Sequence, residues 1–127
     1  MGETVKTIRA LKKIGVERKK IRVVFNKVDT DDDIQQEFAP LFGLAESEKN
    51  CTINVDSAIY SNEVFQRIKE MGVSLETITA DETDYKAQLK VAATDDEKDR
   101  CIAMISLKRL AKTANKNLDD AFAAIFK

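Results

Sequence analysis

Only two short segments of this 127-residue chain have the composition of β-strands. Residues 21–25 are rich in β-branched and aromatic side chains, and the consecutive Val23 and Val24 predict a strand covered on both faces, as in a parallel sheet. Residues 51–55 predict the second strand, which residues 58–60 extend or follow. A two-stranded parallel sheet buries little surface and leaves two edges open. Either the helices enclose this sheet, or a second chain or a missing segment completes it.

Helical patterns surround the two strands in the first 72 residues. Apolar residues at three-residue steps from Val5 to Ile14 predict a helix that stops at Gly15. Residues 34–41 predict a short helix that follows the acidic residues 31–33, is limited by Pro40 and ends at Gly43. Ser61 or Asn62 can cap a further helix, which contains Val64, Phe65, Ile68 and Met71 and closes at Gly72. This α-β-α-β-α order favours an α/β fold with a parallel sheet and flanking helices.

The remainder of the chain has no strand pattern. Residues 73–84 predict a connector anchored by Leu75 and Ile78, and residues 85–127 show only helical signals. Thr94 and Glu97 have the spacing of a capping box. Asn117 is predicted to cap a separate last helix that carries Leu118, Phe122 and Ile125. We therefore expect a single domain over residues 1–127, with an α-β-α-β-α portion up to residue 72 and a connector and C-terminal helices after it.

Composition excludes several functional classes. The chain has no histidine, which removes catalysis and metal binding by imidazole, and we expect no metal site. Its four glycines, at positions 2, 15, 43 and 72, do not form a phosphate-binding loop. The formal net charge of −1 means that any binding to nucleic acid must come from a local patch. No apolar run approaches the roughly 20 residues of a membrane span, and we expect a cytoplasmic protein.

Two features, the thiols and the C-terminal apolar residues, have both a structural and a functional interpretation. Cys51 and Cys101 lie in apolar runs, so we expect reduced thiols in the core rather than reactive groups. Phe122, Ile125 and Phe126 are expected in the core as well, with a partner-docking face as the alternative.

The segment IRVVFNKVD, residues 21–29, together with residues 3–20 resembles the second half of a ParA/MinD-type P-loop ATPase. It is most similar to StbB-type plasmid stability and partitioning proteins. The likeness continues through four further segments: FAPLFGL (38–44), AIYSNEVFQRIKEMG (58–72), ITADETDYKAQL (78–89) and LKRLAKTANKNLDDAFAAIF (107–126). Members of this family are longer, and their N-terminal half carries the Walker A loop and most of the central sheet.

The resemblance implies the C-terminal portion of a partition ATPase with a partial P-loop-NTPase-like sheet. The intact protein would use ATP and Mg²⁺ in plasmid segregation, form a homodimer, and work with a partition adaptor protein and non-specific DNA. We expect no ATP hydrolysis by this chain alone. Two other functions stay open: an interaction module that dimerises through the open sheet edge and apolar helices, and a DNA-binding accessory protein.

Asn26, Lys27 and Asp29 form an N-K-x-D pattern, which we expect in the loop after the first strand. Nucleotides bind at that edge of open α/β sheets. The Asn26 amide can both donate and accept, and the Asp29 carboxylate could accept two N–H donors, as guanine offers. The resemblance implies that the asparagine contacts adenine, so the identity of the base stays open. The alternative is a strand-to-helix turn formed by Asn26 and Asp29.

Tyr60, Ser61 and Asn62 lie where the resemblance implies a second base-contacting loop. Because most nucleotide affinity in such folds comes from the phosphates, we expect binding by this chain to be weaker than millimolar or absent.

The second candidate site is basic. Lys108, Lys112 and Lys116 recur every four residues with Arg109 beside them, so a helix would carry them as one stripe. The resemblance implies non-specific DNA binding by such residues. The alternative is an ordinary solvated helix face, partly neutralised by the acidic residues at 95–99.

Overall fold

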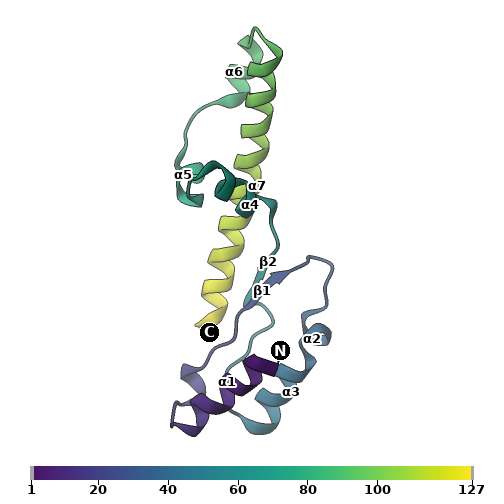
Figure 1. Ribbon diagram of the computed structural model, residues 1–127, viewed down its shortest axis with the longest axis vertical. Coiled ribbons are helices and arrows are strands. Elements are labelled where there is room, and N and C mark those ends of the chain that lie inside the picture. The colour runs from purple at the N-terminus through teal and green to yellow at the C-terminus, as the bar shows by residue number, and fades with distance from the viewer. Residues whose placement is uncertain (1, 127) are drawn as a thin grey trace. The chain divides into compact units, whose positions relative to one another are not determined.

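The computed structural model describes residues 2–126 and is mixed α/β, with more helix than strand (Figure 1). The elements in chain order are α1 (Gly2–Lys13), a 3₁₀ turn (Arg18–Lys20), β1 (Phe25–Val28), α2 (Ile34–Glu37), α3 (Ala39–Glu48), β2 (Ala58–Tyr60), α4 (Glu63–Met71), α5 (Leu75–Ala80), α6 (Tyr85–Val91) and α7 (Asp95–Ile125). The chain forms two compact units. The first contains the residues up to 61 and those from 117 onward, and the second contains residues 62–116. The expectation of one domain over the whole chain stays a prediction.

Strands β1 and β2 form a two-stranded parallel sheet, as the sequence predicts. Phe25 is opposite Ala58 and Val28 is opposite Tyr60, with an irregularity between them where Lys27 has a φ of 54°. A separate parallel bridge joins Arg22 to Thr52.

The predicted strand positions are wrong in part. The first strand begins at Phe25, where the prediction ended, because Phe25 and Val28 enter the core while Val24 is 38% exposed. Residues 51–55 contribute only the bridge at Thr52. A turn then interrupts the chain, in which the amide of Ser57 donates to the carbonyl of Asn54 at 3.0 Å. The strand resumes at residues 58–60.

The core of the first unit lies between the sheet and the helices of its N-terminal part. Its buried residues come from α1, β1, α2, α3 and β2 and from the adjoining loops: Ile8, Ile21, Phe25, Val28, Ile34, Leu41, Leu44, Ala45, Cys51 and Ala58. The Phe25 ring packs against Phe38 and Phe42, with ring centroids 4.6 and 5.6 Å apart. Burial of this apolar surface is the main stabilising contribution to the unit.

The predicted helix over residues 34–43 is instead two helices. Asp33 caps α2, and its carboxylate accepts a hydrogen bond from the amide of Gln36 at 3.3 Å. Pro40 lies in the first turn of α3, where its missing N–H costs nothing, so it starts a helix rather than limiting one. Gly43 is inside α3 and does not end it. The helix continues to Glu48 because Leu44 and Ala45 are buried.

The second unit begins with α4, whose ends agree with the prediction. The Asn62 side chain accepts a hydrogen bond from the amide of Val64 at 2.9 Å, and Gly72 follows the last turn with a φ of 70°. The predicted connector contains helix α5, and its expected anchor Ile78 is buried. The core of this unit consists of Val64, Ile78, Leu107, Ala111 and Ala114.

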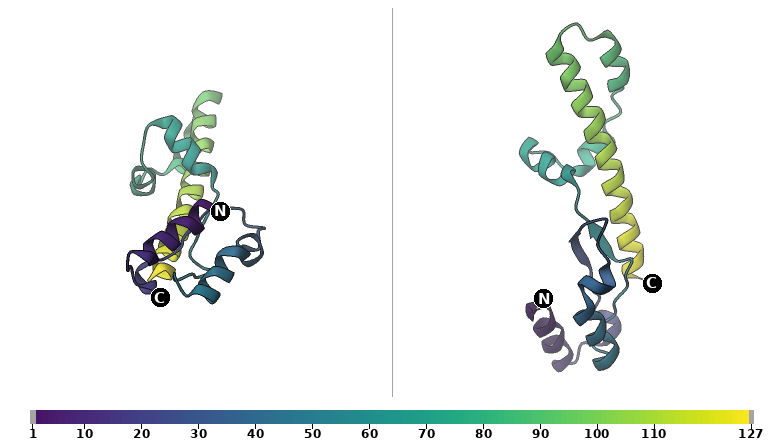
Figure 2. Two further views of the ribbon diagram at one scale, coloured as in Figure 1. Left: turned by 60° about the horizontal axis from the view of Figure 1, so that its bottom comes forward. Right: turned by 90° about the vertical axis from the view of Figure 1, so that its right-hand side faces the viewer.

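Helix α7 is continuous from Asp95 to Ile125, and α6 lies alongside its first turns (Figure 2). Thr94 accepts a hydrogen bond from the amide of Glu97 at 3.2 Å, as the capping box requires, while the Glu97 carboxylate accepts from the amide of Ala93 at 2.9 Å. The predicted separate last helix starting at Asn117 is wrong. Apolar residues recur on one face across this position, and burial of Ala114 and Ala121 keeps the helix intact.

At the end of α7, two phenylalanines that were predicted to lie in the core are exposed. Phe122 is 66% exposed and Phe126 is 63% exposed, so neither lies in the core, and only Ile125 is partly buried. The buried face is formed by the smaller side chains of Ala121 and Ala124. The face with Phe122 and Phe126 therefore points to solvent.

Candidate functional site

The carboxyl ends of β1 and β2 lie side by side. The amide of Ser61 donates to the carbonyl of Val28 at 2.9 Å, so Asp29 and Ser61 follow neighbouring strands at the same sheet edge. Asn26 and Lys27, in contrast, lie inside β1 rather than in the loop that follows it. All four of these polar side chains are exposed.

The N-K-x-D segment makes local hydrogen bonds. The Asn26 side-chain oxygen accepts from the amide of Lys27 at 2.9 Å, next to the positive φ of Lys27. The amide of Asp29 donates to the Asp32 carboxylate at 3.1 Å, and the amide of Asp32 donates to the Asp29 carbonyl at 3.0 Å. The two bonds between Asp29 and Asp32 are those of a turn. The turn interpretation is wrong for Asn26, which lies inside β1. The Asn26 amide nitrogen and the Asp29 carboxylate remain chemically able to meet a base edge.

The Y-S-N segment is divided between the two units. The amide of Tyr60 donates to the Asn117 side chain at 2.9 Å, and Ser61 is exposed. Asn62 belongs to the second unit, where its side chain caps α4 and donates to the carbonyl of Leu110 at 3.2 Å. Both polar atoms of the Asn62 side chain thus have a structural partner, and a base contact would use the second N–H or the second lone pair of the amide.

Asn117 is a structural residue that the sequence prediction misassigned. Its side-chain oxygen accepts from the amide of Tyr60, and its nitrogen donates to the carbonyl of Ala58, both at 2.9 Å. An amide side chain has one acceptor and one donor group, so it satisfies the edge of β2 as a paired strand would. The continuous apolar period through α7 is the sequence signal that could have shown Asn117 to be internal to a helix.

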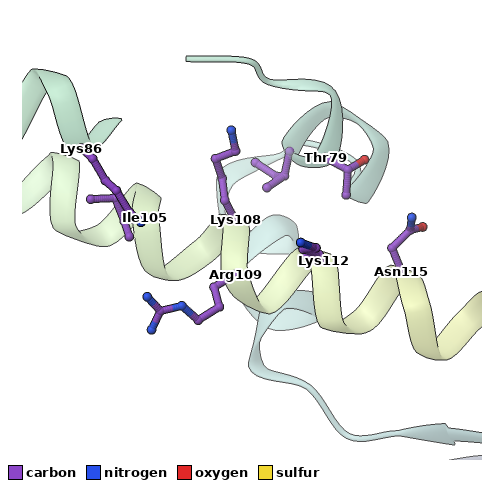
Figure 3. A pocket seen from close by; sticks show the side chains of 8 residues that line it. Thr79, Lys86, Ile105, Lys108, Arg109, Lys112 and Asn115 are labelled. Carbon is purple, nitrogen blue, oxygen red and sulfur yellow. The ribbon is translucent and has the colours of Figure 1, made fainter. Parts of the chain in front are cut away.

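Three of the four basic candidate residues, Lys108, Arg109 and Lys112, lie around a cavity of about 460 Å³ in the second unit (Figure 3). Its lining consists of Ile78, Thr79, Lys86, Ile105, Lys108, Arg109, Lys112 and Asn115, with four basic side chains and no carboxylate. We call it the lysine cavity. In Figure 3, Lys108 rises from α7 on the side of Thr79, whereas Arg109 extends from the opposite side of the helix. Lys116 is exposed one turn further along α7 and is not part of this lining.

Lys86, Thr79 and Asn115 are candidate residues that the sequence prediction missed. Thr79 comes from α5 and Lys86 from α6, and only the packing of these helices on α7 brings them beside Lys108 and Lys112. Asn115 follows Lys112 by three residues and so shares its side of the helix. No local pattern in the sequence links the three residues.

Lys108 has a structural role at one side of the cavity. Its ammonium group donates to the carbonyl of Asp81 and lies 5.8 Å from the centroid of the Tyr85 ring. The Asp81 carboxylate in turn accepts hydrogen bonds from the Thr83 hydroxyl at 2.6 Å, from the Thr83 amide at 3.0 Å and from the Tyr85 hydroxyl. This network holds the loop between α5 and α6.

The hydrogen bonds of this network shift the pKa values of Asp81 and Tyr85. Those from Thr83 and Tyr85 lower the pKa of Asp81 to about 2, with the charge of Lys108 as a smaller cause. The hydrogen bond to Asp81 raises the pKa of Tyr85, because it favours the protonated phenol. The network is therefore complete at neutral pH, with Asp81 ionised.

The two thiols are buried, as predicted, and they are free cysteines. Burial raises the pKa of Cys51 more than the nearby Arg18 guanidinium lowers it, which disfavours the reactive thiolate. Within residues 2–126, no group of three or more cysteine, aspartate or glutamate side chains could hold a metal ion. No helix in the same range is long and apolar enough to cross a membrane.

Comparisons with protein-family models, with curated proteins and with solved structures find no match to this chain.

Proposed function

We propose that this chain is the C-terminal portion of a StbB/ParA-like plasmid partition ATPase, in which the segments at the ends of β1 and β2 contact the nucleotide base. The observation that carries the proposal is the hydrogen bond between the Ser61 amide and the Val28 carbonyl. Because this bond joins the carboxyl ends of parallel strands, Asp29 and Ser61 lie at the sheet edge where open α/β folds bind nucleotides. The resemblance in sequence and this placement support the same role.

The base-binding role is tested by titrating the isotope-labelled chain with ATP and with GTP in an NMR experiment. We expect saturating shifts of the amides of residues 26–29 and 60–61 at concentrations above millimolar, because no phosphate loop adds affinity. Asp29→Ala should reduce binding of GTP, since its carboxylate is the group that matches the two N–H donors of guanine. Asp56→Ala is the control, because it removes the same charge from an exposed turn of the first unit.

Two results would contradict this role. One is the absence of any shift at these residues with either nucleotide. The other is an identical loss of binding in Asp29→Ala and Asp56→Ala, which would indicate a general charge effect.

We also propose non-specific DNA binding as a second candidate function. The observation that favours it is the lysine cavity, which brings Lys86 of α6 beside Lys108 and Lys112 of α7 with no carboxylate in the lining. Basic side chains on adjacent helices can bind successive phosphates. Removing one lysine that binds a phosphate should lower the slope of log affinity against log salt by about 0.9 for duplex DNA.

The DNA-binding role is tested by fluorescence anisotropy with two unrelated duplexes over a range of salt concentrations. Lys86→Glu combined with Lys112→Glu should weaken binding to both duplexes equally and lower the salt dependence. Both residues are exposed and neither has the structural contacts of Lys108, so this variant should fold. Lys90→Glu combined with Lys98→Glu is the matched control, because it also reverses one exposed charge on α6 and one on α7, both outside the cavity. Equal effects of the cavity variant and the control would contradict a specific role for the cavity.

A further inference from the structure

The lysine cavity holds positive charge that the chain itself leaves largely unpaired. Lys86 and Lys112 are exposed and form no ion pair within residues 2–126. Lys108 and Lys112 are four residues apart on α7, and like charges at this spacing destabilise a helix. One partial offset is the Asp81 carboxylate, whose pKa the charge of Lys108 helps to lower. A bound anion would therefore relieve a repulsion that is part of the folded structure.

A carboxylate makes one end of the cavity unfavourable for an anion. A smaller cavity of about 230 Å³ adjoins the lysine cavity and is lined by Asp84, which caps α6 by accepting from the amide of Ala87 at 3.0 Å. The two cavities share Lys86, Ile105 and Lys108. In Figure 3, Lys112 and Asn115 lie at the opposite end of the lysine cavity from Lys86. An anion is therefore favoured near Lys112 and Asn115, away from the Asp84 carboxylate.

The end of the cavity near Lys112 offers several hydrogen-bond donors. The Lys112 ammonium has three N–H groups, and the Lys108 ammonium keeps two after donating one to a backbone carbonyl. The exposed Asn115 amide adds two N–H groups. The Thr79 hydroxyl instead donates to the Glu76 carbonyl at 3.1 Å, so Thr79 borders the site without a free donor. These donors suit an anionic group that has several acceptor oxygens.

The shape and charge of the cavity favour a small phosphorylated molecule over a DNA backbone. The volume of about 460 Å³ lies in the range of small-molecule pockets, about 300 to 1,000 Å³. A duplex is convex, so it contacts the rim of the cavity rather than its interior, and each of its phosphates carries one charge. A terminal phosphate carries a charge of about −1.5 to −2 at neutral pH and has three strong acceptor oxygens. One such group can meet several of these donors at once.

We infer that the interior of the lysine cavity binds the terminal phosphate or pyrophosphate group of a small molecule. The phosphate oxygens accept hydrogen bonds from Lys108, Lys112 and Asn115, and Lys86 adds positive charge at the other end. The inference rests on the same cavity as the proposed DNA binding but does not require it. Because the ligand uses the cations that would contact DNA, an occupied cavity binds DNA more weakly.

The test is an NMR titration of the isotope-labelled full chain with inorganic pyrophosphate, compared with sodium chloride at equal ionic strength. We expect saturating shifts at residues 112 and 115 with a Kd below about 1 mM. Residues 26–29 and 60–61 should not shift, because pyrophosphate has no base, so the result is independent of the base-binding proposal. The absence of saturating shifts in the cavity, or equal shifts with chloride, would overturn the inference.

Two substitutions at the site test which side chains hold the phosphate. Lys112→Gln should weaken pyrophosphate binding about tenfold, through the loss of one charge-assisted hydrogen bond. Asn115→Asp should weaken it further, since a carboxylate of nearly the same size then faces the phosphate. Both residues are exposed, so the variants should fold. Lys98→Gln is the matched control, because it removes an exposed charge of α7 outside the cavity. Equal effects of Lys112→Gln and Lys98→Gln would contradict the inference.

A pair of ligands tests recognition of the terminal phosphate. Adenosine 5′-monophosphate should bind at the cavity residues about tenfold more tightly than cyclic adenosine monophosphate, because the cyclic diester carries a single charge and lacks a terminal phosphate. Equal affinities at these residues would show that the terminal phosphate is not the group recognised.

Competition separates this inference from the DNA-binding proposal. Pyrophosphate should displace duplex DNA more strongly than chloride does at equal ionic strength, as measured by fluorescence anisotropy. Binding of pyrophosphate in the cavity without any binding of DNA would support the inference and contradict the DNA-binding proposal. Binding of DNA that pyrophosphate does not displace beyond the effect of salt would overturn the inference and leave the DNA-binding proposal in place.

Discussion

Asn117 joins helix α7 to strand β2 through both ends of its side-chain amide. The oxygen accepts from the Tyr60 amide and the nitrogen donates to the Ala58 carbonyl. Both hydrogen bonds are part-buried, so water would replace them only incompletely if the side chain were removed. A single residue in the middle of a helix thus closes one edge of the sheet.

Asn117→Ala should lower the free energy of unfolding by about 2 kcal/mol, because two backbone groups lose their partner. Urea denaturation followed by circular dichroism measures this change. Asn115→Ala, which removes an exposed amide two residues earlier, should change the stability by less than about 0.5 kcal/mol. Equal effects of the two substitutions would show that the hydrogen bonds to β2 contribute nothing.

The lowered pKa of Asp81 predicts that acid destabilises the loop between α5 and α6. Its pKa is lowered from 3.8 to about 2, first by the hydrogen bond from the Thr83 hydroxyl, then by those from the Tyr85 hydroxyl and the Thr83 amide. The unfolded chain therefore binds the proton more readily than the folded one. The stabilising contribution of Asp81 is complete above its unfolded pKa near 4 and is lost as the pH falls through about 2.

The measurement for Asp81 is a carbon-13 NMR titration of its carboxyl group. Thr83→Ala should raise the pKa of Asp81 more than Tyr85→Phe does, because the Thr83 hydroxyl is the largest cause of the shift. A pKa that stays near 2 in both variants would mean that another group holds the carboxylate ionised.

At the scale of elements, two glycines occupy different positions: Gly43 lies inside a helix, and Gly72 follows the end of one. Gly43 is inside α3 and a Cβ there would meet no atom within 4 Å. Gly72 follows the last turn of α4 with a φ of 70°, a conformation that side chains other than glycine adopt only with strain. The same substitution should therefore have opposite effects at the two positions.

Gly43→Ala should raise the free energy of unfolding by about 0.5 to 1 kcal/mol through helix propensity. Gly72→Ala should lower it by about 1 kcal/mol. Chemical denaturation of the two variants, compared with the wild-type chain, gives both values. Destabilisation by Gly43→Ala would indicate that α3 ends at this glycine, as the sequence alone suggested.

At the scale of the whole molecule, stability is concentrated in two separate core clusters. The first surrounds Phe25 and Val28, and the second surrounds Val64 and Leu107. Helix α6, in contrast, has no buried residue, and Val91 at its end is 82% exposed. Elements with few buried apolar contacts open with the lowest free energy.

Native-state hydrogen exchange should therefore be fastest in α6 among the helices of the second unit, and slowest around Leu107 and Ala111 of α7. Mass spectrometry of peptides over residues 85–91 and 105–114 makes the comparison. Protection of α6 equal to that of the Leu107 region would mean that contacts beyond the cavity residues hold this helix.

Local patterns predicted the parts of the fold that depend on short-range chemistry. The first helix, the Asn62 cap, the stop at Gly72 and the capping box at Thr94 each depend on residues within one or two turns. The parallel pairing followed from the α-β-α-β-α order. Of the basic candidate residues, Lys108, Arg109 and Lys112 line one cavity and Lys116 does not, and their role in DNA binding stays a prediction.

What the sequence by itself determined was the type and order of most elements, because capping, glycine conformation and apolar periodicity act over a few residues. The tertiary structure decided the exact strands, the continuity of α7 and the composition of the lysine cavity. Phe25 and Val28 define β1 because the core receives their side chains, and α7 continues through Asn117 because Ala114 and Ala121 on either side of it are buried. Lys86 meets Lys108 and Lys112 only because the helices pack together. Such contacts join residues that are distant in sequence, so no local pattern could predict them.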